Sequence, residues 1–91
     1  MNNRFQTKTL TNFTIKELTN KWDKIYYLIV NEADGEEAYF CYQNKIDEAS
    51  WNILVQNSPL FSSYHLEVEF EEYHDSFHDK TFRHVIKLSK K

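Results

Sequence analysis

The chain has 91 residues and a formal net charge of −3, which leaves room for one domain and no second core. Hydrophobic residues make up 41% and aromatic residues 16% of the sequence, too much for a disordered chain. No segment approaches the ~18 apolar residues of a membrane-spanning helix, and the N-terminus lacks the apolar stretch of a secretory signal. Cys41 is the only cysteine, which excludes a disulfide framework. We therefore expect a single cytoplasmic domain over residues 1–91 that does not contact a membrane.

The N-terminal segment combines a weak strand pattern with a strong helix-start pattern. Threonines at alternate positions favour a strand over residues 4–11. Thr14 and Glu17 have the spacing of a capping box, in which two side chains satisfy free backbone N–H groups at a helix start. Trp22 falls on the same helical face as the apolar residues that follow Thr14. The sequence therefore predicts a helix over residues 14–22.

The next segment has the pattern of a β-hairpin. Residues 24–31 and 37–43 are rich in β-branched and aromatic side chains, and Asp34-Gly35 between them is typical of a two-residue hairpin turn. This turn would pair Leu28 with Cys41. It gives one face with Ile25, Tyr27, Ile29, Phe40 and Tyr42, and another with Tyr26, Leu28, Val30, Tyr39 and Cys41. Because both faces are apolar, both need cover, and a binding partner or a second copy in a homodimer would supply it.

A second helix is indicated over residues 46–57. Apolar residues recur at helical spacing from Ile46 onward, Asn44 or Asp47 is suited to cap the N-terminus, and Pro59 cannot continue the helix. We expect the apolar side of this helix to pack on the sheet that the flanking strands form.

The last third of the chain predicts a second hairpin. Residues 65–73 alternate between apolar and acidic side chains, and residues 81–88 have the composition of a further strand. A loop centred on Phe77 gathers apolar pairs on one face and opposite charges on the other, with Glu71 facing Arg83. A shift of one residue would destroy this agreement, which supports the register.

The predicted elements follow the order β-α-β-β-α-β-β. This order indicates an α+β fold, with a mainly antiparallel sheet of 4–5 strands and two helices. The sequence contains no phosphate-binding glycine loop, no nucleophile motif and no Cys–His pair with a third orienting residue. We therefore expect a protein that is not an enzyme and needs no cofactor.

Charge is strongly segregated along the sequence. Residues 46–79 carry eight acidic and no basic side chains, whereas residues 80–91 carry five basic and no acidic ones. Such asymmetry suits either two strands that lie side by side and pair their opposite charges, or a module that binds a basic surface on a partner protein. The residues expected at this partner-binding surface are Glu69, Glu72, Asp75 and Asp79, together with the rings of Tyr26 and Tyr39. A composition rich in amino acids with A/T-rich codons indicates an AT-rich genome, which fits many bacteria, phages and mobile elements. The charge segregation, the doubly apolar hairpin and the absence of catalytic motifs make an inhibitor from a phage or mobile element the leading hypothesis.

Two other functions stay open. The first is a metal- or pH-responsive site formed by His74 and His78 with Asp75 and Asp79, because imidazole and carboxylate groups bind divalent metals and imidazole titrates near neutral pH. The second is single-stranded nucleic-acid binding on the tyrosine-rich face of the first hairpin, where bases would stack. The negative net charge and the few basic residues around that face argue against nucleic acid as a partner.

Overall fold

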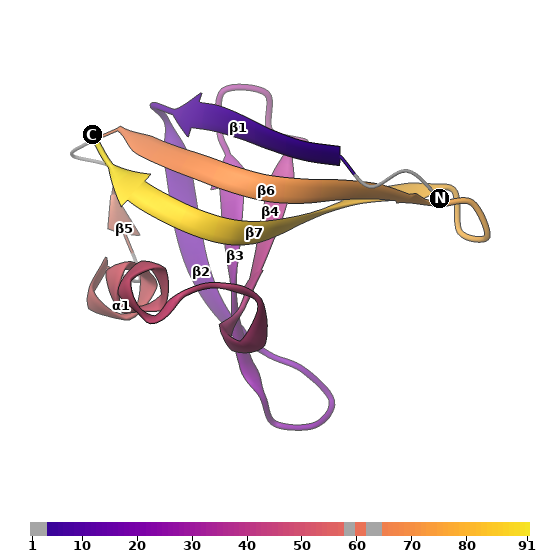
Figure 1. Ribbon diagram of the computed structural model, residues 1–91, viewed down its shortest axis with the longest axis horizontal. Coiled ribbons are helices and arrows are strands. Elements are labelled where there is room, and N and C mark those ends of the chain that lie inside the picture. The colour runs from indigo at the N-terminus through magenta and orange to yellow at the C-terminus, as the bar shows by residue number, and fades with distance from the viewer. Residues whose placement is uncertain (1–3, 58–59, 62–64) are drawn as a thin grey trace.

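The fold is built mainly from β-strands. The computed structural model describes residues 4–57, 60–61 and 65–91, and these contain six strands of five residues or more, a two-residue strand and one α-helix (Figure 1). In chain order the elements are β1 (Arg4–Leu10), β2 (Phe13–Thr19), β3 (Ile25–Asn31), β4 (Ala38–Tyr42), the 3-10 helix η1 (Gln43–Lys45), α1 (Glu48–Asn57), β5 (Leu60–Phe61), β6 (Leu66–Asp75) and β7 (Lys80–Lys90).

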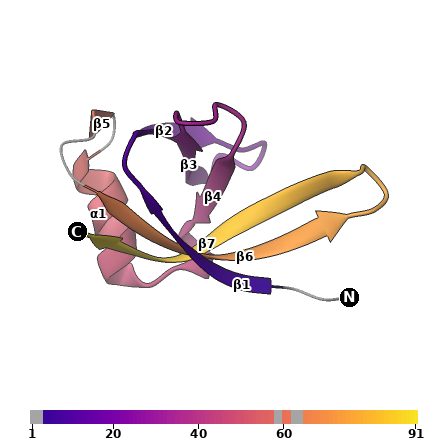
Figure 2. The ribbon, with the colours of Figure 1, turned by 90° about the horizontal axis from the view of Figure 1, so that it is seen from above.

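The strands form one mixed sheet that folds over on itself. Their order across the sheet is β1-β6-β7-β4-β3-β2-β5, and all neighbouring strands are antiparallel except β4 and β7, which are parallel. The half formed by β1, β6 and β7 crosses the half formed by β2, β3 and β4 at a steep angle (Figure 1, Figure 2). Inward-facing side chains of both halves make the core, and α1 lies beside the end of β7.

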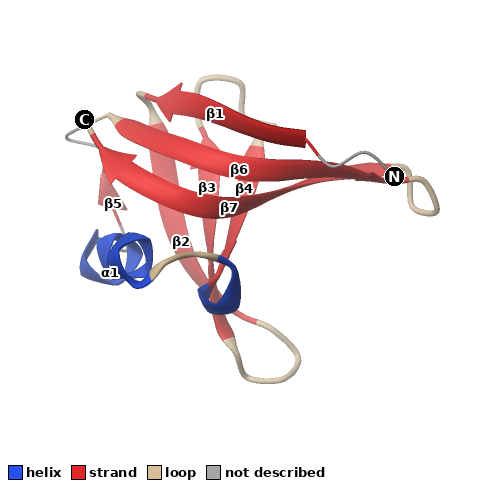
Figure 3. Ribbon diagram, in the orientation of Figure 1, coloured by secondary structure: helices blue, strands red, loops and turns tan. Residues whose placement is uncertain are grey.

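This architecture differs from the predicted α+β fold. The expectation of two helices on an antiparallel sheet of 4–5 strands is wrong, because the described residues contain one α-helix and a larger, mixed sheet (Figure 3). The parallel pair of β4 and β7 joins strands that are far apart in the sequence. A local pattern carries no signal for such a pairing, which is why the expected sheet was too small and purely antiparallel.

The predicted helix over residues 14–22 is also wrong, because this segment forms strand β2. Alternate side chains at the start of β2 are buried, as a strand requires. The two residues of the supposed capping box have other partners. The Thr14 hydroxyl donates to Glu32 Oε1 at 2.8 Å, and Glu17 Oε1 accepts from the Tyr27 hydroxyl at 3.0 Å. Pairing with β3 along its whole length therefore outweighs the local helix signal of this segment.

The second predicted helix is confirmed as α1. Its cap is Asp47 and not Asn44, since Asp47 Oδ1 accepts a hydrogen bond from the N–H of Ser50 at 3.1 Å. Leu54 is fully buried, so the helix packs with its apolar side on the core. The helix stop predicted from Pro59 lies outside the described residues.

The first predicted hairpin is present, but its register is shifted by one residue. Strands β3 and β4 are joined by a loop over residues 32–37, longer than the predicted two-residue turn. Asp34 stabilises this loop, because its Oδ1 accepts hydrogen bonds from two of the N–H groups that follow it, at 3.0 and 2.8 Å. Leu28 consequently pairs with Phe40 and not with Cys41. The shift exchanges the two faces of β4, whose core residues are Tyr39 and Cys41 and whose outward residues are Phe40 and Tyr42.

The second predicted hairpin is confirmed as β6 and β7, with a different register. A β-bulge between Glu69 and Phe70 shifts the pairing partway along the strands. The single register predicted for the whole hairpin is therefore wrong. Beyond the bulge, Arg83 faces Glu72 and not Glu71.

Candidate functional site

The far end of the β6–β7 hairpin stands out from the body of the fold. Within the described residues, β1 pairs with β6 as far as Glu72. Beyond that point, residues 73–75 of β6 pair with residues 80–82 of β7. We call residues 73–82 the arm, and Figures 1 and 2 show it projecting away from the rest of the sheet.

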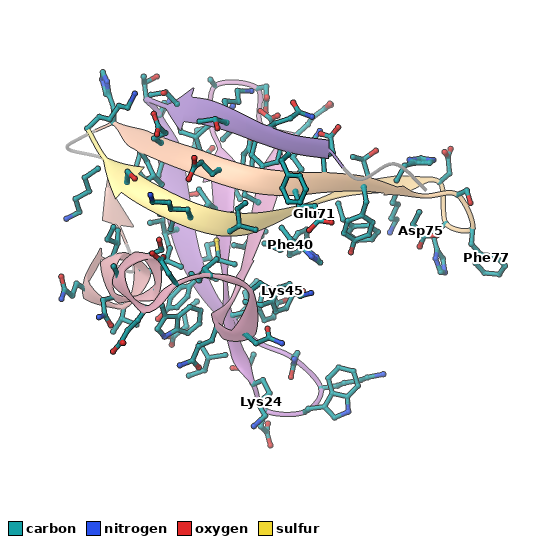
Figure 4. All side chains as sticks on the ribbon, in the orientation of Figure 1. Lys24, Phe40, Lys45, Glu71, Asp75 and Phe77 are labelled. Atoms are coloured by element: carbon teal, nitrogen blue, oxygen red, sulfur yellow. The ribbon has the colours of Figure 1, made fainter. Side chains whose placement is uncertain are left out.

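The tip of the arm is a hydrogen-bonded turn that presents one aromatic ring. Asp75 Oδ1 accepts hydrogen bonds from the N–H groups of Phe77 and His78, at 3.0 and 3.3 Å, and Asp75 Oδ2 lies 2.7 Å from His78 Nδ1. These contacts, chiefly the one with the His78 side chain, lower the pKa of the Asp75 carboxyl. Phe77 is 90% exposed and points away from the turn (Figure 4). The turn therefore holds a large apolar side chain in water.

The four acidic residues expected to bind a partner lie in different surroundings. Asp75 and Asp79 are together at the tip of the arm, where the side chain of Asp79 is 95% exposed. Glu72 lies at the base of the arm and accepts a hydrogen bond from Arg83 Nε at 3.0 Å. Glu69 is half-buried in the sheet, beside the bulge. The structure thus brings two of the four carboxylates together at the tip.

The two histidines of the arm each pair with one aspartate. His78 lies against Asp75, and His74 Nε2 is 3.3 Å from Asp79 Oδ1. In the part of the chain that the structure describes, no three His, Cys, Asp or Glu side chains are arranged to hold a metal ion. The four residues of the metal- or pH-responsive alternative are therefore present as two separate pairs.

Charged side chains from both halves of the sheet meet at the base of the arm. Glu37 forms an ion pair with Lys8 of β1 and lies 3.6 Å from Arg83, which also binds Glu72. Asn31 Nδ2 donates to Glu37 Oε2 at 3.1 Å. Burial opposes the ionisation of Glu37, but the hydrogen bonds from Lys8 and Asn31 outweigh it and lower its pKa to about 2. We call these five residues the base cluster.

The two tyrosines expected at the partner surface have opposite positions. Tyr39 is fully buried, and its ring packs edge-on against Phe70 with centroids 5.0 Å apart. Burial, together with the neighbouring Glu37 carboxylate, raises the pKa of the Tyr39 hydroxyl. Tyr39 therefore belongs to the core and is not part of the candidate surface, whereas Tyr26 points outward.

Tyr26 belongs to a continuous outward-facing group of rings, which we call the ring face. Its members are Tyr26, Phe40, Tyr42, Tyr73, Phe82 and His84, all half-buried. Neighbouring ring centroids in this group are 5.0–6.5 Å apart, so the rings support one another. The Tyr73 hydroxyl lies 3.2 Å from His84 Nε2. The ring face thus runs without a break from β3 across β4 and β7 to the arm.

Most of the ring face was missed in the sequence because both hairpin registers were shifted. The two-residue turn predicted in the first hairpin put Tyr39 on the same face as Tyr26, where Phe40 and Tyr42 lie in the structure. In the second hairpin the bulge turns His84 outward. Phe40 and Tyr42 alternate with the core residues of β4, and this pattern would have placed them beside Tyr26 if the length of the preceding loop had been predicted correctly.

Comparison with known proteins adds no relative. No family model, no curated protein and no solved structure matches this chain. Among the described residues, no helix has both the length and the apolar character needed to cross a membrane. Function is therefore inferred from the arm, the ring face and the charges around them.

Proposed function

We propose that this protein is a non-enzymatic binding module that docks its arm onto another protein. The observation that carries the proposal is Phe77, a phenylalanine 90% exposed at the tip of a projecting hairpin. Phe77 is the most exposed large apolar side chain among the described residues, and buried aromatic anchors dominate the binding energy of protein interfaces. The partner is therefore expected to offer an apolar pocket to this ring.

The hydrogen bonds of the turn favour such docking. Asp75 already holds the backbone N–H groups of Phe77 and His78, so the tip need not be ordered when the partner binds. A left-handed backbone at Asp79, with φ of 50°, completes the turn. Preorganisation of this kind reduces the conformational entropy lost on association.

The charge of the arm supports a basic partner surface. Asp75 and Asp79 flank Phe77 in the turn, whereas Glu72 pairs with Arg83 at the base of the arm and Glu69 lies back in the sheet. Carboxylates around an apolar anchor orient a basic surface during encounter, and this attraction weakens with salt. We expect the association rate to fall as ionic strength rises.

A small module of this kind suits an inhibitor that occupies a basic protein surface in the cytoplasm. The bias toward amino acids with A/T-rich codons supports an origin in a phage or mobile element. Homodimerisation through the ring face is the alternative, and sedimentation of the isolated protein distinguishes the two. A dimer that persists at low micromolar concentration would favour the alternative.

The role of Phe77 as the anchor is tested by comparing its removal with the removal of another exposed phenylalanine. Phe77→Ala removes the ring at the tip, and Phe5→Ala removes a ring that is 70% exposed on β1, opposite Glu71. Wild-type protein captures partners from a bacterial lysate, and calorimetry then measures the affinity of each purified partner for the variants. We expect Phe77→Ala to weaken binding at least ~30-fold and Phe5→Ala to change it less than ~2-fold.

Stability measurements keep this experiment interpretable. Both rings are exposed, so both variants should melt within about 2 °C of the wild type. Equal partner affinity of Phe77→Ala and wild type would overturn the proposal.

A further inference from the structure

A cleft of about 520 Å³ lies at the end of the ring face that is remote from the tip of the arm. Its wall is formed by the β2–β3 loop, the end of β4, η1 and β7. The lining residues that matter here are Trp22, Lys24, Tyr42, Gln43, Lys45 and His84. Figure 4 labels Lys24 and Lys45 at this end of the molecule, away from Phe77 and the arm.

Hydrogen bonds to the Asn20 side chain and within the backbone hold the β2–β3 loop in place. Asn20 Oδ1 accepts hydrogen bonds from the N–H groups of Trp22 and Lys24, at 2.9 and 3.0 Å. The Asn20 N–H in turn donates to the Lys24 carbonyl at 3.0 Å, which closes the loop. Trp22 is nevertheless 68% exposed. The loop therefore has a defined backbone and presents an exposed indole ring at the cleft.

The opposite wall of the cleft is formed by the rings of Tyr42 and His84, and contacts with neighbouring rings support them. The Tyr42 ring stacks on Tyr26 with centroids 5.3 Å apart and meets His84 edge-on at the same distance. Burial and the positive charge of Lys45 lower the pKa of His84, whereas the negative charge of Glu71 raises it, and the lowering prevails. Charge from Lys45 and from Glu71 therefore acts at this wall of the cleft.

The cleft is locally basic although the chain is acidic. Lys24 and Lys45 line it, and no Asp or Glu is among its lining residues. Lys21 Nζ lies 4.5 Å from the centroid of the Trp22 ring and adds a third ammonium group nearby. Asp23 lies in the same loop but does not line the cleft. Exposed ring faces beside ammonium groups are the combination that binds a flat aromatic group carrying a negative charge.

We propose that this cleft binds a nucleotide unit, with its base against Trp22 or Tyr42 and its phosphate between Lys24 and Lys45. Gln43 also lines the cleft, and in the proposed complex its amide would hydrogen-bond the edge of the base. The volume lies within the ~300–1,000 Å³ of small-molecule sites. The same chemistry is offered by a free nucleotide and by one unit of a single strand. This site is separate from the arm, so the test of nucleotide binding does not depend on whether the arm binds a protein partner.

Chemical-shift titration of the full chain tests the site with adenosine monophosphate as the probe. We expect saturable shifts confined to residues near the cleft, in the β2–β3 loop, η1 and around His84. Adenosine and inorganic phosphate, each lacking half of the nucleotide, should bind at least ~10-fold more weakly.

Paired lysine variants give the control. Lys24→Gln combined with Lys45→Gln should weaken binding of adenosine monophosphate at least ~10-fold. Lys80→Gln combined with Lys87→Gln removes the same charge from exposed positions on β7 and should change the affinity less than ~2-fold. Trp22→Ala should weaken binding at least ~5-fold through lost stacking.

A single-stranded oligodeoxyadenylate of about eight nucleotides distinguishes the two sources. Affinity for the strand at least ~10-fold above that for the mononucleotide supports a site for single-stranded nucleic acid, and equal affinity supports a site for a free nucleotide. Absence of saturable shifts with both probes, or equal effects of the two double-lysine variants, would overturn the proposal.

Discussion

Glu37 is the residue on which both halves of the folded sheet converge. It precedes β4 in one half and contacts Lys8 of β1 and Arg83 of β7 in the other. Its side chain is 16% exposed, so its charge depends on these partners and on Asn31 for stabilisation. Removing a charged partner from such a group leaves the others unsatisfied, which costs more than the pair itself contributes.

The base cluster makes stability depend on acid pH. The pKa of Glu37 is lowered in the folded state from 4.5 to about 2, so its stabilisation is present above the higher value and lost as pH falls through the lower one. We expect Glu37→Gln to reduce the free energy of unfolding at pH 7 by about 1–3 kcal/mol. Between pH 4.5 and pH 2 the variant should lose less stability than the wild type does.

Urea unfolding at pH 7, 4.5 and 2.5 measures this difference. Glu36→Gln is the control, because Glu36 is exposed in the adjoining loop and should change stability by less than ~0.5 kcal/mol. Parallel stability curves for wild type and Glu37→Gln across acid pH would contradict the role given to this carboxylate.

At the residue scale, the sequence identified types of side chain better than their orientation. Tyr26 and Tyr39 were both expected on a surface, and the length of one loop decided that Tyr39 is buried. Asp75 and Asp79 were correctly placed near the end of a hairpin, because the loop around Phe77 is local. No sequence pattern pointed to Lys24 and Lys45 as neighbours, because they come together only when β2, η1 and β7 are assembled.

Among the elements, α1 packs on the core and is also hydrogen-bonded to β7 through a buried serine. Ser50 is 1% exposed, and its Oγ accepts a hydrogen bond from the N–H of Leu88 at 2.9 Å and lies 3.4 Å from the Leu88 carbonyl. The serine hydroxyl therefore satisfies backbone groups near the end of β7.

We expect Ser50→Ala to reduce the free energy of unfolding by about 1–3 kcal/mol, because it leaves a buried N–H without an acceptor. Ser76→Ala, at an exposed position in the tip of the arm, should change it by less than ~0.5 kcal/mol. Thermal unfolding followed by circular dichroism measures both. If Ser50→Ala, Ser76→Ala and the wild type had the same melting temperature, the hydrogen bonds of the Ser50 hydroxyl would contribute nothing to stability.

The elements that the sequence predicted correctly share a strong pattern of their own. The alternation in β6 and the helical spacing in α1 identified both, whereas the Thr14–Glu17 pattern in β2 predicted a helix that does not form. Capping residues are equally good hydrogen-bond partners across a sheet, so their spacing alone does not decide between helix and strand. The bulge beside Glu69 left no visible trace in the alternation.

On the scale of the whole molecule, stability should be unevenly distributed. Residues 66–70 of β6 have neighbouring strands on both sides, but residues 73–75 pair with β7 alone within the described chain. We expect amide hydrogens of the arm to exchange at least about a hundredfold faster than those of residues 66–70 and 85–88. Hydrogen exchange followed by NMR checks this, and equal protection would show that the arm opens only with the body.

The crossing of the two half-sheets could not be predicted from the sequence. Adjacent strands in the chain gave both hairpins, yet the pairs β1–β6 and β4–β7 link segments that no local pattern relates. The candidate site divides in the same way: the tip of the arm is local and was anticipated, whereas the ring face and the cleft depend on the long-range pairs.

The pairing of β1 with β6 has a consequence for the nascent chain on the ribosome. Arg4 of β1 pairs with Glu72 of β6, so β1 cannot pair until a strand 68 residues further along the chain has been made. At about 5–20 residues per second, this wait lasts roughly 3–14 s. Strands β2, β3 and β4 can pair in succession during that time, while β1 keeps an unpaired edge open to other chains. Chaperones that hold exposed strand edges would therefore meet this protein during its synthesis, before either binding surface exists.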